Sequence, residues 1–350
     1  MNPPQEKIPV AILGATGAVG QRFLERLAHH PVFEPTVLAA SDRSAGKTYA
    51  EATTWVLDSP LPAAAAKRTV VGLGGVAASE ARVCFSALPS DQAREWERPL
   101  AAAGKAVFTN ASPYRMAPDV PLLIPEVNPD HLALVERQDT PDGGFLVANG
   151  NCSGIILTLA LAPLHRAFGI SDVHVTTLQG LSGAGYPGVS AMDVVDNVVP
   201  YIGGEEDKLE TEPQRTLGGL DEAAEFTVHP TCTRVPVREG HLESVHLTLG
   251  RAASLDEVRA ALADFRGPPE VAGLPSAPEQ PIQVLDADDR PQPRRDRDLA
   301  GGMAVSIGRL RLTGDGRSLR MVILGHNTVR GAAGQSVLNA EYAHAMGHMA

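Results

Sequence analysis

The segment from Asn149 to Gly154 places a thiol at the start of an apolar, helix-like run. Cys152 lies in the motif Asn151-Cys152-Ser153, and residues 155–164 continue without a charged side chain. A helix N-terminus carries partial positive charge and N–H groups without partners in the helix, which favour a thiolate over a thiol. We therefore predict that Cys152 is a nucleophile near neutral pH and that its backbone N–H is an oxyanion donor.

Thiol chemistry needs a group that moves protons, and His241 is the best placed histidine. Segments 232–237 and 241–249 flank a short turn, so we expect Arg234 and His241 to lie close together on neighbouring strands. A guanidinium beside an imidazole would hold a substrate carboxylate next to a proton acceptor. A structural role is the simpler interpretation of a lone histidine, but the nearby arginine favours catalysis.

Four further polar residues carry weaker signals. Gln179 ends a predicted strand, where its amide would orient a carbonyl group or a water molecule. Glu205 and Lys208 are three residues apart, which on a helix predicts an ion pair of small energetic value. Arg115 is a generic surface arginine until a partner for it is identified.

A glycine-rich turn follows the first apolar strand, residues 8–13, and precedes a segment with helical periodicity. Its spacing is GxxGxxG, and glycines there let the backbone approach a pyrophosphate bound at the helix N-terminus. A plain tight turn is the alternative interpretation. The flanking elements favour dinucleotide binding by Gly14, Thr16, Gly17, Ala18, Val19 and Gly20.

The loop after the second strand, residues 41–47, is expected to lie at the adenosine ribose. Asp42 would accept a hydrogen bond from the 2′-hydroxyl of NAD, whereas hydrogen-bond donors would hold the 2′-phosphate of NADP. The loop has more hydrogen-bond donors than acidic side chains, so NADP is the predicted cofactor. The residues expected to bind the 2′-phosphate end of NADP are Ser41, Arg43, Ser44 and Lys47.

The strands that must position these residues show two different sequence patterns, which predict two domains. Short apolar strands that alternate with helices predict a parallel, doubly wound Rossmann-type α/β domain over residues 1–148. Longer alternating strands beyond it predict an α+β catalytic and dimerisation domain with a mostly antiparallel sheet over residues 149–330. The last segment, residues 331–350, is expected to be a helix that returns to the first domain. The longer predicted strands are 172–179, 232–237, 241–249, 303–312 and 319–324.

Composition limits the class of protein. The net charge of −11, without a cluster of Lys and Arg, argues against nucleic-acid binding. Three cysteines without a CxxC motif indicate reduced thiols, and no targeting or membrane-spanning segment is recognised. The expectation is a soluble cytoplasmic enzyme without a catalytic metal.

These segments together resemble the aspartate-semialdehyde dehydrogenase family, in its archaeal and fungal type of sequence. The similarity covers nearly the whole chain and includes the glycine turn, residues 124–128 (IPEVN), Asn151-Cys152-Ser153, Arg234-Val235-Pro236-Val237 with His241, and residues 327–341. Gly150 and Gly154 depart from the proline and threonine expected around the nucleophile.

The resemblance implies a role for each candidate residue. Cys152 would be the nucleophile, His241 the acid/base and Gln179 the group that orients the substrate. Arg234 would bind the substrate α-carboxylate and Glu205 its ammonium, and Arg115 with Lys208 would bind the phosphate. It also adds cofactor-binding residues from beyond the nucleotide loop, which are Ser182, Gly183 and Asn327.

The implied reaction is NADPH-dependent reductive dephosphorylation of L-aspartyl 4-phosphate to L-aspartate 4-semialdehyde through a cysteine thioester, in the biosynthesis of lysine, threonine and methionine. Separately, the broad sheet predicted for the second domain suggests a homodimer, which could pair into a homotetramer. A malonyl-CoA reductase on the same scaffold is an alternative, but its substrate has no ammonium for Glu205. A catalytically silent NADP-binding protein is another, although neither the nucleophile nor the base is missing.

Overall fold

The computed structural model describes residues 6–140 and 142–349, which form two compact units. The first contains the described residues up to Leu123, Asp130–Asn149 and those from Ser336 onwards. The second contains Ile124–Pro129 and Gly150–Gln335. None of the helices in the described part of the chain has the length and apolar character needed to cross a bilayer.

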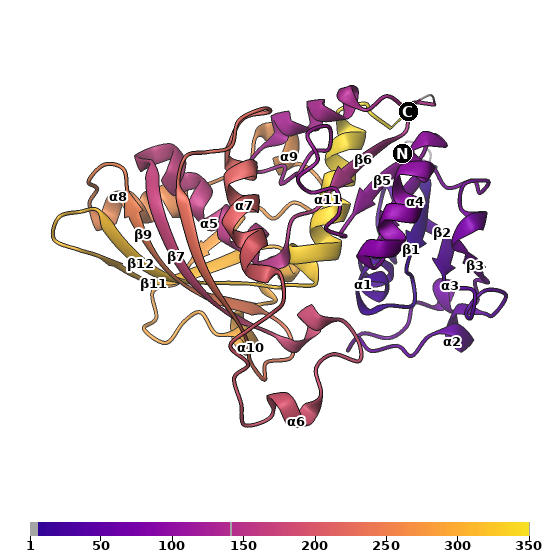
Figure 1. The fold of residues 1–350 in the computed structure, drawn as a ribbon, viewed down its shortest axis with the longest axis horizontal. Coiled ribbons are helices and arrows are strands. Elements are labelled where there is room, and N and C mark those ends of the chain that lie inside the picture. The colour runs from indigo at the N-terminus through magenta and orange to yellow at the C-terminus, as the bar shows by residue number, and fades with distance from the viewer. Residues whose placement is uncertain (1–5, 141, 350) are drawn as a thin grey trace, which may run out of the picture. The chain divides into compact units, whose positions relative to one another are not determined.

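A six-stranded parallel sheet forms the core of the first unit (Figure 1). Its strand order is β3-β2-β1-β4-β5-β6, which is the order of a doubly wound dinucleotide-binding fold. The strands are β1 (Ile8–Leu13), β2 (Phe33–Ala40), β3 (Val70–Gly72), β4 (Val83–Ser86), β5 (Ala106–Thr109) and β6 (Phe145–Ala148). Strands β4 and β5 are buried along their whole length because helices cover parallel sheets on both faces.

Helices and turns connect these strands. The longer helices are α1 (Ala18–Leu27) and α4 (Ser90–Ala102). The shorter helical segments are α2 (Tyr49–Ala52), α3 (Ala63–Ala66), η1 (Leu73–Gly75) and η2 (Pro129–Arg137). The structure confirms the predicted strand at 8–13.

The second unit contains a mixed six-stranded sheet in the order β10-β11-β12-β9-β7-β8 (Figure 1). The β11–β12, β12–β9 and β9–β7 pairs are antiparallel, and the two outer pairs are parallel. The strands are β7 (Ile170–Gln179), β8 (Thr227–Arg234), β9 (His241–Leu249), β10 (Ile282–Val284), β11 (Val305–Leu312) and β12 (Ser318–Gly325). The predicted fold class is confirmed.

Helices cover one face of this sheet. The central one, α5 (Cys152–Phe168), is buried along most of its length against β9 and β12. A capping box of Ser254 and Glu257 begins α8 (Leu255–Ala263). The other helical segments of this unit are η3 (Leu181–Ala184), α6 (Ala191–Val194), α7 (Glu205–Leu217), α9 (Pro269–Ala272), α10 (Pro293–Asp296), η4 (Leu299–Gly302) and η5 (Val329–Ala333). The last helix, α11 (Gly334–Ala345), belongs to the first unit from Ser336 onwards.

The predicted pairing of the segments around residue 238 is wrong. β8 ends at Arg234, and β7 lies between β8 and β9 in the sheet. The chain after β8 crosses the end of β7 instead of turning back, because Val235 donates its backbone N–H to the Gln179 carbonyl and Leu181 donates to the Val237 carbonyl. Arg234 and His241 are therefore not on neighbouring strands.

Candidate active site

Helix α5 begins at Cys152, and Asn151 is its N-cap. The Asn151 side-chain oxygen accepts hydrogen bonds from the backbone N–H groups of Ser153 at 3.0 Å and Gly154 at 3.1 Å. This cap leaves the Cys152 side chain partly exposed at the positive end of a 17-residue helix. Burial, in contrast, raises the pKa of both Cys84 and Cys232 to about 12. Cys152 is thus the reactive candidate among the three thiols.

Arg234, Gln179 and His241 form a row across the ends of three strands. Gln179 is in register with Arg234 of β8 on one side and with His241 of β9 on the other. The turn η3 covers this row, since a Cβ on Gly183 would lie 2.7 Å from Arg234 Nη1 and 3.0 Å from His241 Cε1. The three side chains thus gather at one place, with Gln179 in the middle.

His241 is completely buried, and its surroundings define its protonation state. Its Nδ1 accepts a hydrogen bond from the backbone N–H of Gly180 at 3.1 Å, so the neutral ring carries its proton on Nε2. Burial, assisted by the positive charge of Arg234, lowers the pKa of His241 to about 3. Among the described residues Nε2 has no hydrogen-bond partner. The ring therefore presents an N–H donor to a group that enters the site.

Arg234 supplies positive charge beside the thiol. Its Nη1 donates to the Gly180 carbonyl at 2.8 Å and to Gln179 Oε1 at 3.4 Å. Burial lowers the pKa of the guanidinium, while negative charge on Cys152 and Glu205 opposes this shift. The side chain is only 5% exposed, so an anion that paired with it would also have to leave water.

Glu205 supplies the negative charge of the site. Its carboxylate accepts hydrogen bonds from Asn151 Nδ2 at 2.9 and 3.0 Å, from Gln179 Nε2 at 3.3 Å and from Lys208 Nζ at 2.7 Å. Burial alone would raise the pKa of Glu205, but the charge and hydrogen bond of Lys208, together with the two amides, outweigh it and lower the pKa. Glu205 is thus a buried carboxylate and not a neutral acid. The surface ion pair expected of Glu205 and Lys208 is in fact a mostly buried one.

Further predicted residues lie around this group. Asn327 donates from its amide to Ser182 Oγ at 2.8 Å, and its side-chain oxygen accepts from the Gly240 backbone at 2.8 Å. Ser182 and Asn327 therefore join η3 to the start of β9. Arg115 is buried in the first unit, where its Nη2 donates to the Asn110 carbonyl at 2.8 Å.

Comparison with known proteins identifies the family. Residues 9–135 match the semialdehyde dehydrogenase NAD binding domain, and residues 161–330 match the semialdehyde dehydrogenase dimerisation domain. The aspartate-semialdehyde dehydrogenase of Methanothermobacter thermautotrophicus is 52% identical over 95% of this chain and 98% of its own length. That of Aspergillus fumigatus is 45% identical over 97% of both chains. This chain belongs to the aspartate-semialdehyde dehydrogenase family.

Solved structures of the family have the same fold. The crystal structure of the Candida albicans aspartate-semialdehyde dehydrogenase with NADP has a TM-score of 0.88 at 40% identity, over 98% of this chain and 100% of that one. Aspartate-semialdehyde dehydrogenase II from Vibrio cholerae, complexed with ASA, has a TM-score of 0.78 at 27% identity, over 97% and 98% of the two chains. The predicted family, fold class, oxidoreductase class and dinucleotide-binding domain are confirmed.

The glycine turn of the first unit has the geometry that a dinucleotide pyrophosphate requires. Gly14 has a φ of +74°, and a Cβ at Gly20 would lie 2.3 Å from the Gly14 carbonyl oxygen. The N-cap residue of α1, Gly17, provides no side-chain cap, and the first turn of α1 has no acidic residue. The helix start is therefore open to an anion. The loop 41–47 is mostly exposed.

The sequence analysis did not predict the roles of three residues that lie at or near this site in the second unit. Asn151 caps α5, and this role was readable from an asparagine directly before the helix. Glu212 accepts a hydrogen bond from the Asn151 backbone N–H at 2.5 Å. Glu243 is fully buried on the same face of β9 as His241 and faces the Ser153 hydroxyl. The alternation in segment 241–249 could have revealed a carboxyl on the apolar face.

We expect Glu243→Gln to stabilise the protein in a pH-dependent way. Burial raises the pKa of Glu243 well above its ordinary value of 4.5. Above pH 4.5 the unfolded chain releases this proton while the folded chain keeps it, so wild-type stability falls as pH rises, by up to about 1.4 kcal/mol per pH unit. Glu243→Gln cannot titrate, and its advantage in denaturant midpoint should be absent near pH 4 and grow towards pH 8. The exposed Glu210→Gln is the control, and a constant difference across this range would contradict the assignment.

We expect Gly331→Ala to damage the thiol site. A Cβ at Gly331, in the π-helix η5, would lie 2.6 Å from Cys152 Cβ. Overpacking of this kind costs about 1–3 kcal/mol, and the displaced thiol should lower kcat at least roughly tenfold. The control is Gly273→Ala, where an added Cβ meets nothing within 4 Å. Full activity and unchanged thermal stability of Gly331→Ala would show that the two residues do not touch.

Proposed function

We propose that the protein catalyses the NADPH-dependent conversion of L-aspartyl 4-phosphate, with release of phosphate, to L-aspartate 4-semialdehyde. The observation that carries the proposal is the pairing of a buried cation and a buried anion around one thiol. Arg234 suits the α-carboxylate of this substrate, and Glu205 suits its ammonium. Lys208 and Arg115 are the residues proposed for the phosphate.

Acylation is the first chemical step. The Cys152 thiolate attacks the acyl carbon, and the C–O bond to phosphate breaks when the tetrahedral intermediate collapses to a thioester. The Gln179 amide lies between Arg234 and His241, where it can orient the substrate. Lys208 now pairs with Glu205 at 2.7 Å, so the substrate ammonium would compete for the carboxylate and release Lys208 towards the phosphate.

Reduction is the second step. NADP(H), held by the glycine turn and the loop 41–47, supplies a hydride when bound. The Nε2–H of His241 donates a hydrogen bond to the carbonyl oxygen of the thioester and stabilises the negative charge that hydride addition places on that oxygen. When this oxyanion re-forms the carbonyl, the C–S bond breaks, which releases the aldehyde and restores the Cys152 thiolate. His241 thus acts as a neutral hydrogen-bond donor and keeps its proton throughout the cycle.

The proposal also includes the oligomeric state of the protein and the cellular compartment in which it works. The match of residues 161–330 to a dimerisation domain supports a homodimer or a homotetramer. The three cysteines are free, which supports a reducing compartment such as the cytoplasm. Residues 1–148 are assigned to NADP binding, residues 149–330 to catalysis and dimerisation, and residues 331–350 to a helix that completes the first domain. Ser182, Gly183 and Asn327 are assigned to the cofactor from the second unit.

Replacing the nucleophile tests the core of the proposal. We expect Cys152→Ser to lose roughly three orders of magnitude or more of the NADPH formed from aspartate semialdehyde and phosphate, because a serine hydroxyl at this position lacks a thiolate. NADP binding, measured by calorimetry, should survive. Alkylation of the wild type should modify Cys152 before the buried Cys84 and Cys232. Equal, slow alkylation of all three thiols together with absent turnover would favour a silent NADP-binding protein.

Replacing Arg234 tests the substrate assignment. We expect Arg234→Ala to raise the KM for aspartate semialdehyde by roughly 10- to 100-fold, because a charged hydrogen bond to the carboxylate is lost. Exposed Arg311→Ala should leave KM unchanged. The same assays on malonyl-CoA, whose acyl group has no ammonium for Glu205, should show no NADPH consumption. An unchanged KM in Arg234→Ala, or efficient turnover of malonyl-CoA, would overturn the assignment.

A further inference from the structure

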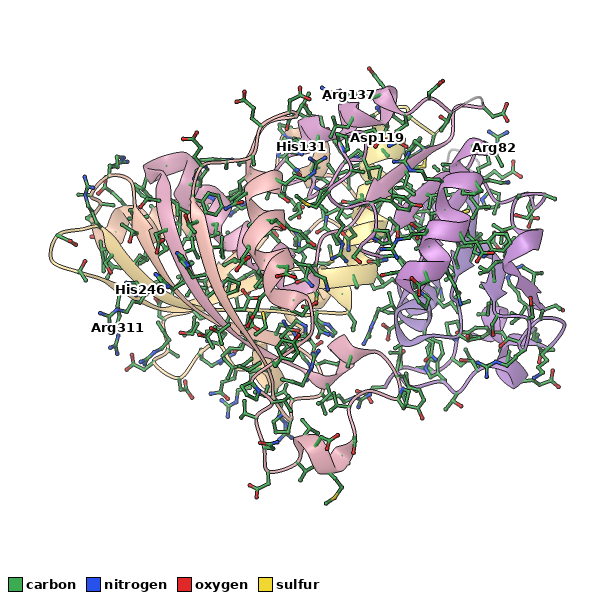
Figure 2. All side chains as sticks on the ribbon, viewed as in Figure 1. Arg82, Asp119, His131, Arg137, His246 and Arg311 are labelled. Carbon is green, nitrogen blue, oxygen red and sulfur yellow. The ribbon has the colours of Figure 1, made fainter. Side chains whose placement is uncertain are left out.

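A ladder of cationic and titratable side chains crosses the outer face of the sheet in the second unit. His229 of β8, His174 of β7 and His246 of β9 are in register, and Arg320 of β12 and Arg311 of β11 continue the row. All of them are exposed, on the side of the sheet opposite its buried core. Figure 2 shows His246 and Arg311 close together on this sheet. Proposed catalysis uses none of these residues.

One carboxylate joins two of the histidines. Asp172 lies two residues before His174, on the same face of β7. Its Oδ1 lies 2.8 Å from His174 Nε2, and its Oδ2 lies 3.0 Å from His229 Nε2. The two imidazole rings stack with their centroids 4.6 Å apart and 19° between their planes. Both Nε2 atoms therefore point towards the same carboxylate.

We propose that Asp172, His174 and His229 form a binding site for one divalent transition-metal ion of the zinc class. Their ligand atoms lie within 4.8 Å of one another. Ligands about 2.0–2.1 Å from a tetrahedral zinc ion are about 3.3 Å apart, so small side-chain movements would complete the three-ligand set. Two imidazoles and a carboxylate suit Zn²⁺, Co²⁺ or Ni²⁺ better than Mg²⁺ or Ca²⁺, which prefer oxygen ligands.

The remaining residues of the ladder, His246, Arg320 and Arg311, indicate at which end of it a cation would bind. His246 hydrogen-bonds through Nε2 to Ser318 Oγ at 2.6 Å, and it is in register with the cationic Arg320. A cation is therefore favoured at the Asp172 end and disfavoured at the arginine end. In the single chain the side chains of His174 and His229 are 61% and 49% exposed.

An ion at this place would be structural. β8 is the edge strand of the sheet, and the ion would join it to β7. Five residues further along the same two strands are Gln179 and Arg234, about 16 Å away at the rise of a β-strand. Metal binding would thus stabilise the pairing of the strands that end in the catalytic row, without touching the reacting atoms.

Metal titration of the full-length protein tests the site. The chain carries Cys152→Ser, which removes a competing thiolate, and is stripped of metal with a chelator. We expect calorimetry to show one Zn²⁺ per chain and Co²⁺ to develop the absorption of a nitrogen- and oxygen-ligated ion. Binding should be at least tenfold weaker in Asp172→Asn and His229→Gln and unchanged in His246→Gln. Saturating Zn²⁺ should raise Tm by roughly 5 °C in the Cys152→Ser chain and not in His229→Gln.

The outcomes separate a metal site from a hydrogen-bonded cluster. Loss of saturable binding in the two ligand variants alone supports the site. Absence of stoichiometric Zn²⁺ binding to the Cys152→Ser chain, or equal binding in His229→Gln, overturns it. Because His229 takes no part in the proposed reaction, His229→Gln in the wild-type background should retain turnover, which keeps this test independent of the catalytic assignment.

Discussion

The active site depends on how Asn151 holds the first turn of α5. Its side-chain oxygen caps the helix, its backbone N–H binds Glu212 and its side-chain amide binds Glu205. Glu205 and Glu212 are seven residues apart on α7, which is two helical turns, so both carboxylates face the same way. One asparagine thus couples the helix that presents the thiol to the helix that carries Glu205.

Charge in this site is distributed by burial as much as by residue type. The pKa of Glu205 is lowered because Lys208 and two amides surround it, whereas the pKa of Glu243, two residues along β9 from His241, is raised because only a hydroxyl compensates its burial. His241 stays neutral because it is buried beside Arg234 and accepts an N–H at Nδ1. The site therefore combines the Arg234 cation, the Glu205 anion and the neutral hydrogen-bond donor His241.

Close backbone approach brings these groups together. Gly183 allows η3 to pack on Arg234 and His241, and Gly331 allows η5 to pack on Cys152. Gly150 and Gly154, which depart from the pattern of the family, both face Glu212 Oε2, at 3.4 and 3.5 Å from the position of a Cβ. Both distances are ordinary van der Waals contacts, so Glu212 leaves space for a Cβ at either position.

Much of this protein follows from local sequence. The thiol at a helix start, the glycine turn and the strand His241–Leu249 were predictable because caps, turns and side-chain alternation act over a few residues. Tertiary structure decided the rest. β7 and β8 are parallel neighbours joined through α7, and this crossover placed Gln179 between Arg234 and His241 where a short turn had suggested a hairpin. The tautomer of His241, the neutral state of Glu243 and the histidine ladder likewise depend on strands that pair across long sequence separations, because burial and register arise only when distant segments share one sheet.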